Sequence, residues 1–225
     1  MRIQKNHTSP TFKSIAELKK ICEETLVEFH QEFPRLKSPT KLWQDSENAG
    51  CETKRNLFKE LHTIWSKKYK ALKLEYVKYE KNEYPSYDES MEKLKELMKE
   101  HGVSNCGYMN NYYQYMLAKK GVYSECSGLE VFSHAPMFAS EEPIKNHLYL
   151  YVKESEKAPD SLVADSWLNC VEDVDKFEPH IIDYMQLDPK KQFICEDRPI
   201  LLQGYDHFLS RTKSKQNNIT SQLQR

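Results

Sequence analysis

Hydrophobic positions recur every three or four residues along most of the first hundred residues of the chain. This spacing is typical of amphipathic helices. Ser14 and Glu17 form a capping-box pattern at the start of the first helical stretch, and Pro34 is expected to end it. The pattern predicts a helical region over residues 1–100, which either packs on the rest of the chain or recognises a partner protein.

Two further helical stretches belong to this region. One runs from about Lys54 to Asn82, and its lysine-rich side allows two interpretations. It is either a binding surface for a partner protein or a solvated helix face in which glutamates accompany the lysines. The next stretch is expected to begin with Asp88 as its cap and to end at Gly102.

A run of 17 residues, 102–118, contains no Asp, Glu, Lys or Arg. It is too polar for a membrane-spanning helix and too poor in charge for a helix at the protein surface. We therefore expect a central, mostly buried helix that begins near Asn105 or Cys106 and ends at Gly121.

Extended segments follow this helix. Four are expected, of which the second alternates in hydrophobicity and the fourth leads into Ile200–Leu202: Leu129–Ser133, His147–Val152, Leu162–Ala164 and Gln192–Ile194. The fold class expected is α+β, with a helical region followed by a core over residues 101–210 in which the central helix packs on an antiparallel sheet. Residues 211–225 are polar and are expected to form a disordered tail.

Composition narrows the function classes. The 33 Lys and Arg residues nearly cancel the 34 Asp and Glu residues, so we expect no general attraction to nucleic acid or to anionic membranes. The six glycines allow neither a dinucleotide-binding nor a P-loop motif, and the six cysteines contain no C-x-x-C pair. No cofactor and no metal are expected. Without a secretory signal or a stretch of ~20 apolar residues, we expect a reducing, cytosol-like compartment and no membrane span.

Three residues stand out for their places on the expected elements. Cys106 lies at the start of the charge-poor helix, where the helix dipole favours the nucleophilic thiolate and backbone N–H groups can bind an oxyanion. His147 starts a strand and can serve as the base. Asp165 ends the next strand and can orient the imidazole. Gly107 leaves room for a substrate backbone.

The order of four motifs adds a family resemblance over roughly residues 100–170. Asn105-Cys106-Gly107 at a helix start precedes Leu117–Gly121, then Asn146 to Val152, and finally Val163 to Trp167. This order resembles the core of the transglutaminase-like branch of the papain-like cysteine enzymes, especially the versions found in bacterial effector proteins.

The resemblance implies a catalytic triad with Cys106 as the nucleophile, His147 as the base and Asp165 as the orienting group. It also places Asn105, Gly107 and Trp167 near the substrate. The reaction implied is attack on a carboxamide or amide of a protein substrate through a thioester, giving deamidation, transamidation or proteolysis. A bacterial effector of this kind acts on a host protein after specialised secretion.

Several alternatives stay open from the sequence. Cys106 can be a buried structural thiol, Asp165 a turn cap and Trp167 plain core, while His134 competes with His147 as the base. Cys106, His134, His147 and Asp165 could in principle also form a metal site. The alternative function is a non-enzymatic helical interaction module; a third is an acyltransferase that uses the same triad on a small substrate.

Overall fold

The structure is a computed structural model of the chain. It describes residues 13–38, 51–133, 145–154, 158–159, 162–185, 187 and 192–200, with side chains left out at 51–55, 57–58, 145, 193 and 195–200. The predicted α+β class is confirmed, with helices first and an antiparallel sheet after them. Two expectations concern residues outside these ranges: His134 as the competing base, and the tail over residues 211–225.

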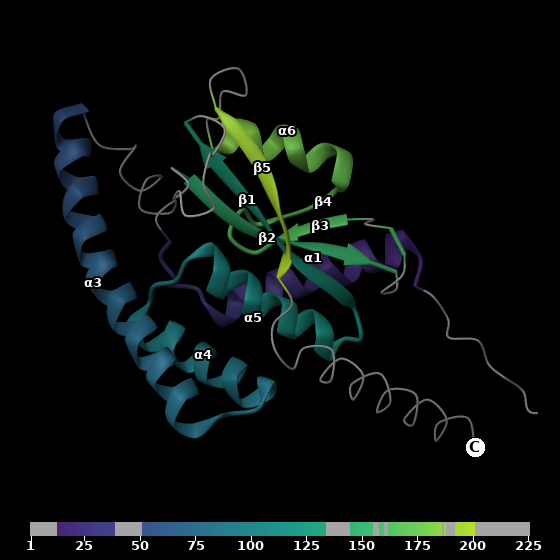
Figure 1. The fold of residues 1–225 in the computed structure, drawn as a ribbon, viewed down its shortest axis with the longest axis horizontal. Helices are drawn as coiled ribbons and strands as arrows, with labels where there is room; N and C mark the ends of the chain where they lie inside the picture. Colours follow the sequence, from purple (N-terminus) through teal and green to yellow (C-terminus); the bar gives the residue numbers. More distant parts are fainter. Residues whose placement is uncertain are drawn as a thin grey trace, which may run out of the picture.

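Five helices and five strands make up the described part (Figure 1). They follow the chain in this order: α1 (Ile15–Glu32), α3 (Cys51–Glu83), α4 (Tyr87–His101), α5 (Cys106–Lys119), β1 (Tyr123–Phe132), β2 (Lys145–Lys153), β3 (Leu162–Asp165), β4 (Cys170–Asp173), α6 (Val174–Tyr184) and β5 (Phe193–Ile200). The strands form one sheet in the order β4-β3-β2-β1-β5, and every neighbouring pair is antiparallel.

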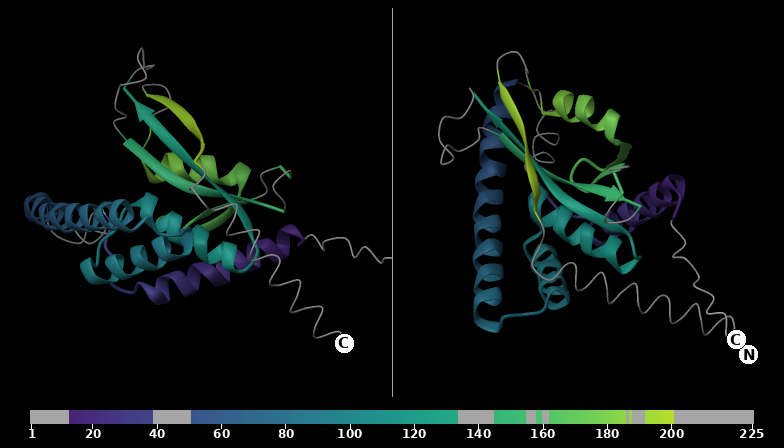
Figure 2. Two further views of the ribbon diagram at one scale, coloured as in Figure 1. Left: turned by 60° about the horizontal axis from the view of Figure 1, so that its bottom comes forward. Right: turned by 45° about the vertical axis from the view of Figure 1, so that its right-hand side comes forward.

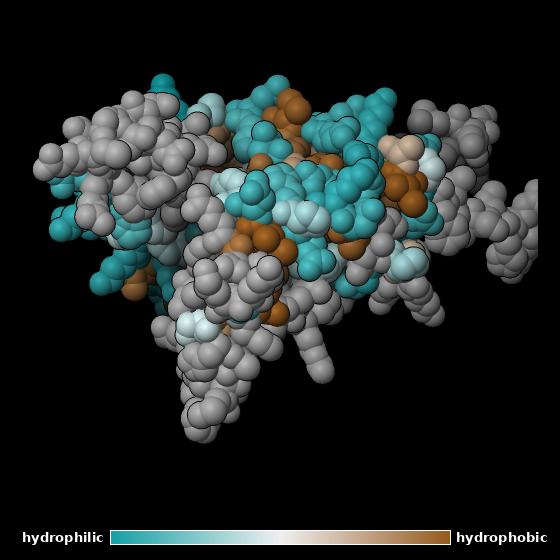
Figure 3. All heavy atoms as spheres, turned by 90° about the horizontal axis from the view of Figure 1, so that it is seen from above, coloured by the Kyte–Doolittle hydropathy of each residue, from teal (hydrophilic) through white to brown (hydrophobic). Residues whose placement is uncertain are grey.

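Helices cover both faces of this sheet (Figure 2). On one face α5 packs on β1 and β2, and α1 packs on β3 and β4; on the other face α6 packs on β3 and β4. The long helix α3 packs on α4 and extends beyond it along one side of the molecule (Figure 1). Seen from above, the described residues show hydrophobic patches separated by hydrophilic ones (Figure 3).

The helices of the first hundred residues share one hydrophobic core with α5 and the sheet. Phe29 of α1, Leu94 of α4, Tyr113 of α5 and Leu150 of β2 are all buried in the same cluster. The Tyr113 hydroxyl crosses it and donates to the carbonyl of Cys22 at 2.7 Å. The first helices therefore form part of the support on which α5 rests.

The predicted helix ends are confirmed at most positions, with one correction. Ser14 and Glu17 form the expected capping box. The cap of α4, however, is Ser86, which forms a second capping box with Glu89; Asp88 lies in the first turn, where its carboxylate accepts from the Tyr115 hydroxyl. Serine and aspartate are both good caps, so composition alone did not separate two positions this close.

The strand predictions needed corrections. Strand β5 runs over Phe193–Ile200, where a short strand at Gln192–Ile194 followed by Ile200–Leu202 was expected. Strand β1 begins at Tyr123 rather than Leu129, because it lies in the middle of the sheet and is buried on both faces, so its sequence does not alternate. Strand β4 and helix α6 were missed. Strand β4 has only four residues, and Pro179 inside α6 obscures a helix whose Phe177 and Ile181 are buried.

Candidate active site

Helix α5 begins as the sequence predicts, with Asn105 as its cap. The Asn105 side-chain oxygen accepts from the Tyr108 N–H at 2.9 Å, and its carbonyl accepts from the Met109 N–H at 3.0 Å. The N–H groups of Cys106 and Gly107 therefore have no intrahelical acceptor. The partly exposed Cys106 thiol lies at the positive end of the helix, among donors that can bind an anion.

Asn105 is also held from the side of α3. Its amide Nδ2 donates to the Tyr69 hydroxyl at 2.7 Å, and the Tyr69 ring stacks on Trp65 with centroids 4.9 Å apart. Burial raises the pKa of Tyr69, and the nearby Cys106 thiol adds to the effect. The predicted substrate contact Asn105 thus has a structural role in the described residues, and an aromatic pair from α3 lies beside the thiol.

His147 and Asp165 form a buried pair across neighbouring strands. The His147 Nε2 atom and the Asp165 Oδ2 atom are 2.5 Å apart, and both side chains are 0% exposed. Burial by itself lowers the pKa of His147. The Asp165 carboxylate more than offsets this, and Cys106 adds to it, so the pKa of His147 lies above its ordinary value.

Cys106 lies near the same imidazole. Its thiol lies close enough to raise the pKa of His147. The ring nitrogen Nδ1 is buried and has no aligned hydrogen-bond partner within the described residues. An imidazole that lies near a thiol and has one unpaired ring nitrogen can take or return a proton, and catalytic hydrogen bonds commonly tighten only when substrate binds.

Asp165 serves as a turn cap and as the partner of His147 at once. While Oδ2 faces the imidazole, Oδ1 accepts from the N–H groups of Trp167 at 2.9 Å and Leu168 at 3.2 Å. The two interpretations of this carboxylate are therefore compatible, because each of its oxygens fulfils one of them.

Asn110, which the sequence analysis did not single out, connects the parts of the site. It lies four residues after Cys106 on α5 and is fully buried. Its Nδ2 donates to the carbonyl of Leu148 at 2.5 Å and to Asp165 Oδ1 at 3.1 Å. Its Oδ1 accepts from the N–H and the hydroxyl of Ser166, both at 2.9 Å. One amide thus ties the helix of Cys106 to the strand of His147 and to the Asp165 turn.

Trp167 covers the imidazole. Its ring centroid lies 4.5 Å from that of His147, with 38° between the planes, and it also contacts the Tyr184 ring. The indole Nε1 is buried and lacks a hydrogen-bond partner among the described residues. The site therefore holds two buried, unpaired ring nitrogens close together, which is unusual for a purely structural core.

Gly107 has a packing role that the sequence analysis did not foresee. A Cβ built at this position would lie 3.2 Å from the Leu148 Cδ1 atom and 3.5 Å from the Asn105 side-chain oxygen. The absent side chain therefore lets the first turn of α5 approach β2 closely.

The other described thiols are placed differently. Burial raises the pKa of Cys22 and of Cys126 to about 12, and it also raises the pKa of Cys170. A thiol held in its protonated form is a poor nucleophile. The side chains of Cys51 and Cys195 lie outside the described residues.

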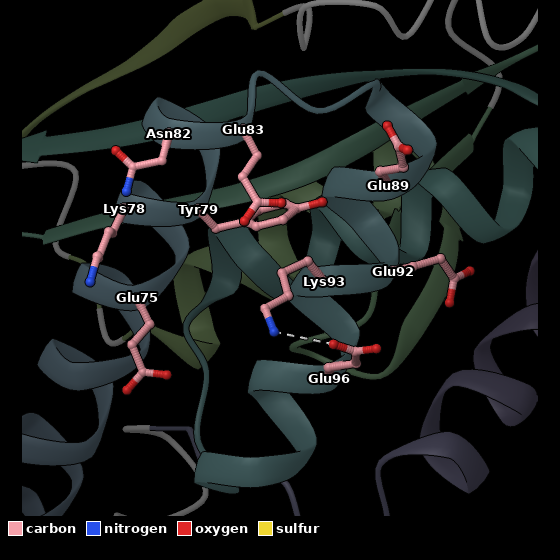
Figure 4. A pocket seen from close by; sticks show the side chains of 9 residues that line it. All are labelled: Glu75, Lys78, Tyr79, Asn82, Glu83, Glu89, Glu92, Lys93 and Glu96. Carbon is pink, nitrogen blue, oxygen red and sulfur yellow. Dashed lines mark hydrogen bonds and ion pairs between the residues drawn. The ribbon is translucent and has the colours of Figure 1, made fainter.

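A surface cleft between α3 and α4 is lined by none of the residues Cys106, His147 and Asp165 (Figure 4). It has a volume of about 580 Å³ and is lined by five glutamates, two lysines, Tyr79 and Asn82. Its lining includes no thiol and no histidine, so it lacks the groups that acyl transfer needs. Lys93 and Glu96 pair within it at 3.3 Å, as is ordinary for neighbouring helical residues.

Comparisons with protein-family models, with curated proteins and with solved structures found no match to this chain. Among the described residues, no helix is long and apolar enough to cross a membrane. The case for a function therefore depends on the geometry of the site itself.

Proposed function

We propose that the protein is a cysteine-dependent acyl-transfer enzyme that acts on a carboxamide or amide of a protein substrate. In this proposal Cys106 is the nucleophile, His147 the general base and acid, and Asp165 the group that orients the imidazole. The observation that carries it is the fully buried pair of His147 and Asp165, with the Cys106 thiol near enough to the same imidazole to affect its pKa. The family proposed is the transglutaminase-like branch of the papain-like enzymes.

The first half of the proposed reaction forms a thioester. With the Cys106 proton on His147, the thiolate attacks the carbonyl carbon; a C–S bond forms and the carbonyl oxygen becomes an oxyanion. The N–H groups of Cys106 and Gly107 are the available donors for that oxyanion. When the oxyanion collapses, the C–N bond breaks, and ammonia or an amine leaves with the proton from His147.

The second half returns the enzyme to its starting state. A water molecule or a primary amine attacks the thioester carbon, gives one proton to His147, and displaces the Cys106 thiolate. Water yields a carboxylic acid, which is deamidation or proteolysis according to the first leaving group; an amine yields a new amide, which is transamidation. Asp165 stabilises the imidazolium in both halves without accepting its proton.

A product assay tests this proposal. A set of glutamine-containing peptides and unfolded proteins is incubated with the enzyme, and ammonia release, incorporation of a fluorescent primary amine and peptide cleavage are followed. We expect at least one product with the wild type and none with Cys106→Ala, while Cys51→Ser, which removes a thiol outside the proposed triad, keeps full activity. Product formation that persists in Cys106→Ala contradicts the proposal.

A further inference from the structure

A thiol, a carboxylate and an imidazole that could bind a metal ion lie together on the face of the sheet covered by α6. Cys170 and Glu172 are alternate residues of β4, so their side chains leave the strand on the same side. Helix α6 packs on β4 and brings His180 to them. The Cys170 sulfur, a Glu172 carboxylate oxygen and a His180 ring nitrogen all lie within 4.8 Å of one another.

These three donors are the ligand types that zinc and related transition metals use in proteins. Zinc takes thiolate, imidazole and carboxylate ligands at about 2.0–2.3 Å, commonly in a tetrahedron. Donor atoms no more than 4.8 Å from one another can reach these distances from a shared ion after small changes of side-chain rotamer. The chain spacing from Cys170 to His180 is short, so the ligands come from one strand and the helix that follows it.

The hydrogen bonds of this group leave one carboxylate oxygen unpaired, which could bind a metal ion. His180 Nδ1 pairs with Glu172 Oε1 at 2.8 Å, but Glu172 Oε2 is buried and has no partner within the described residues. The side chains of His180 and Glu172 are 38% and 25% exposed, so an ion can reach them from solvent. An unpaired carboxylate oxygen beside a thiol costs free energy that a cation would offset.

We propose that Cys170, Glu172 and His180 bind a divalent transition-metal ion of the zinc class, with water completing its coordination. The thiol gives up its proton to solvent when the metal–sulfur bond forms, as thiolate ligation requires. The other described grouping of this kind, Glu75, Glu100 and His101, offers no thiol. The proposal does not rest on the proposed enzymatic activity.

The site adjoins the proposed triad. Cys170 is the direct partner of Asp165 in the register of β3 and β4, and both residues face the same side of the sheet. A metal ion on Cys170 therefore places positive charge close to the carboxylate that supports His147. Binding of the metal is expected to slow alkylation of Cys106 in the wild type, because the cation competes with the imidazolium for the charge of Asp165.

Titration with Co²⁺ as a spectroscopic substitute for zinc tests the proposal directly on the full chain. We expect a single equivalent of Co²⁺ to produce a thiolate-to-cobalt charge-transfer band and visible bands of tetrahedral intensity, and Zn²⁺ to displace it. Cys106→Ser is expected to keep the band, which excludes the proposed nucleophile as the sulfur ligand. Cys170→Ser is expected to abolish it.

Two further variants keep the test decisive if Cys170→Ser folds poorly. His180→Ala and Glu172→Gln are expected to weaken Co²⁺ binding by ~10- to 100-fold or more, whereas His101→Ala at the other grouping leaves it unchanged. Circular dichroism checks the folding of each variant. A wild type without the charge-transfer band, or a band that survives in folded Cys170→Ser, overturns the proposal whatever the outcome of the product assay.

Discussion

A single buried amide, Asn110, explains how the proposed catalytic residues keep their places. It makes four hydrogen bonds to three residues in two segments, β2 and the Asp165 turn, and all of its donors and acceptors are used. A buried polar side chain is stable only when its hydrogen bonds are made, so its presence fixes the distance between α5, β2 and the Asp165 turn. Asn110 acts in this account as a positioning residue for Asp165.

Substitution of Asn110 tests that role. Asn110→Ala leaves Leu148, Asp165 and Ser166 without their partner, and we expect the free energy of unfolding to fall by about 2–4 kcal/mol. We also expect alkylation of Cys106 to slow and its pH profile to move to higher pH, since Asp165 is no longer held against His147. Chemical denaturation and rate measurements give both values. The neighbouring Asn111→Ala serves as the control; an equal effect there would contradict the role.

Asp165 controls the charge of His147, and a single-atom change tests this. In the wild type the raised pKa of His147 keeps the imidazole protonated above its ordinary range near pH 6.5. In Asp165→Asn the burial effect remains without the carboxylate, so the pKa of His147 falls and the ring is neutral at pH 7.

The expected result is a changed pH profile for the alkylation of Cys106. We expect the wild type, in which His147 is protonated, to react at neutral pH, whereas Asp165→Asn requires a more alkaline solution for the same rate. Iodoacetamide rates between about pH 5.5 and 9 cover the range in which the two proteins differ. Coincident profiles would show that Asp165 does not influence the thiol.

Sequence reasoning selected three residues that lie near one another in the structure, but not the amide that joins them. Cys106, His147 and Asp165 are recognisable because each residue type has a chemistry suited to its place at an element end. Asn110 has no reactive chemistry, and its value depends on which strand and turn pack against α5. The only sequence signal was its position four residues after Cys106, on a helix too poor in charge to lie at the surface.

Among the elements, the join between α4 and α5 sets where the thiol lies. Gly102 ends α4 with φ of 65°, and its N–H bonds to the carbonyl of Met98 at 3.0 Å. Val103 then forms an isolated parallel β-bridge with Lys37, and Asn105 caps α5 two residues later. The left-handed glycine therefore determines the direction in which the chain enters α5, the helix that carries Cys106.

Substitution at Gly102 is expected to cost stability through backbone strain alone. A Cβ there would meet no atom within 4 Å, but the positive φ disfavours it by about 1–2 kcal/mol. We expect Gly102→Ala to lose about this much unfolding free energy and Gly102→Asn to lose less, because asparagine tolerates the left-handed region. Thermal unfolding of the two variants measures the difference, and equal stability of Gly102→Ala and wild type would contradict it.

Helices and strands were predictable where the spacing of hydrophobic residues and the capping residues matched the side of the element that is buried. The amphipathic helices and the capping box at Ser14 and Glu17 were found because side-chain spacing and capping are local properties. The start of β1 and the whole of β4 were not, since a central strand lacks alternation and a four-residue strand exists only through its neighbours. Helix α6 was hidden by Pro179.

For the molecule as a whole, the first hundred residues and the proposed catalytic segment depend on each other. Buried side chains of α1, α3 and α4 lie in one cluster with those of α5 and the sheet. A fragment of residues 101–210 would expose the face of α5 that packs on these helices. The sequence left open whether this region packs on the core, and the shared core shows that α1 and α4 do so.

We expect the isolated fragment 101–210 not to fold. Exposure of a helix face that is buried in the whole chain removes much of the hydrophobic stabilisation of a small domain. Urea unfolding followed by circular dichroism is expected to show a cooperative transition for residues 1–210 and none for 101–210. A cooperative transition in the fragment would show that the two regions are independent domains.

The central claim is that Cys106 is a nucleophile activated by His147, and selective alkylation measures this without any substrate. The folded protein is treated with a small amount of iodoacetamide near neutral pH, and mass spectrometry follows all six cysteines over time. Our account predicts that Cys106 reacts far faster than the other five, and that its rate falls in His147→Ala while theirs do not change. Equal reactivity of the accessible thiols, or a Cys106 rate unaffected by His147→Ala, would contradict it.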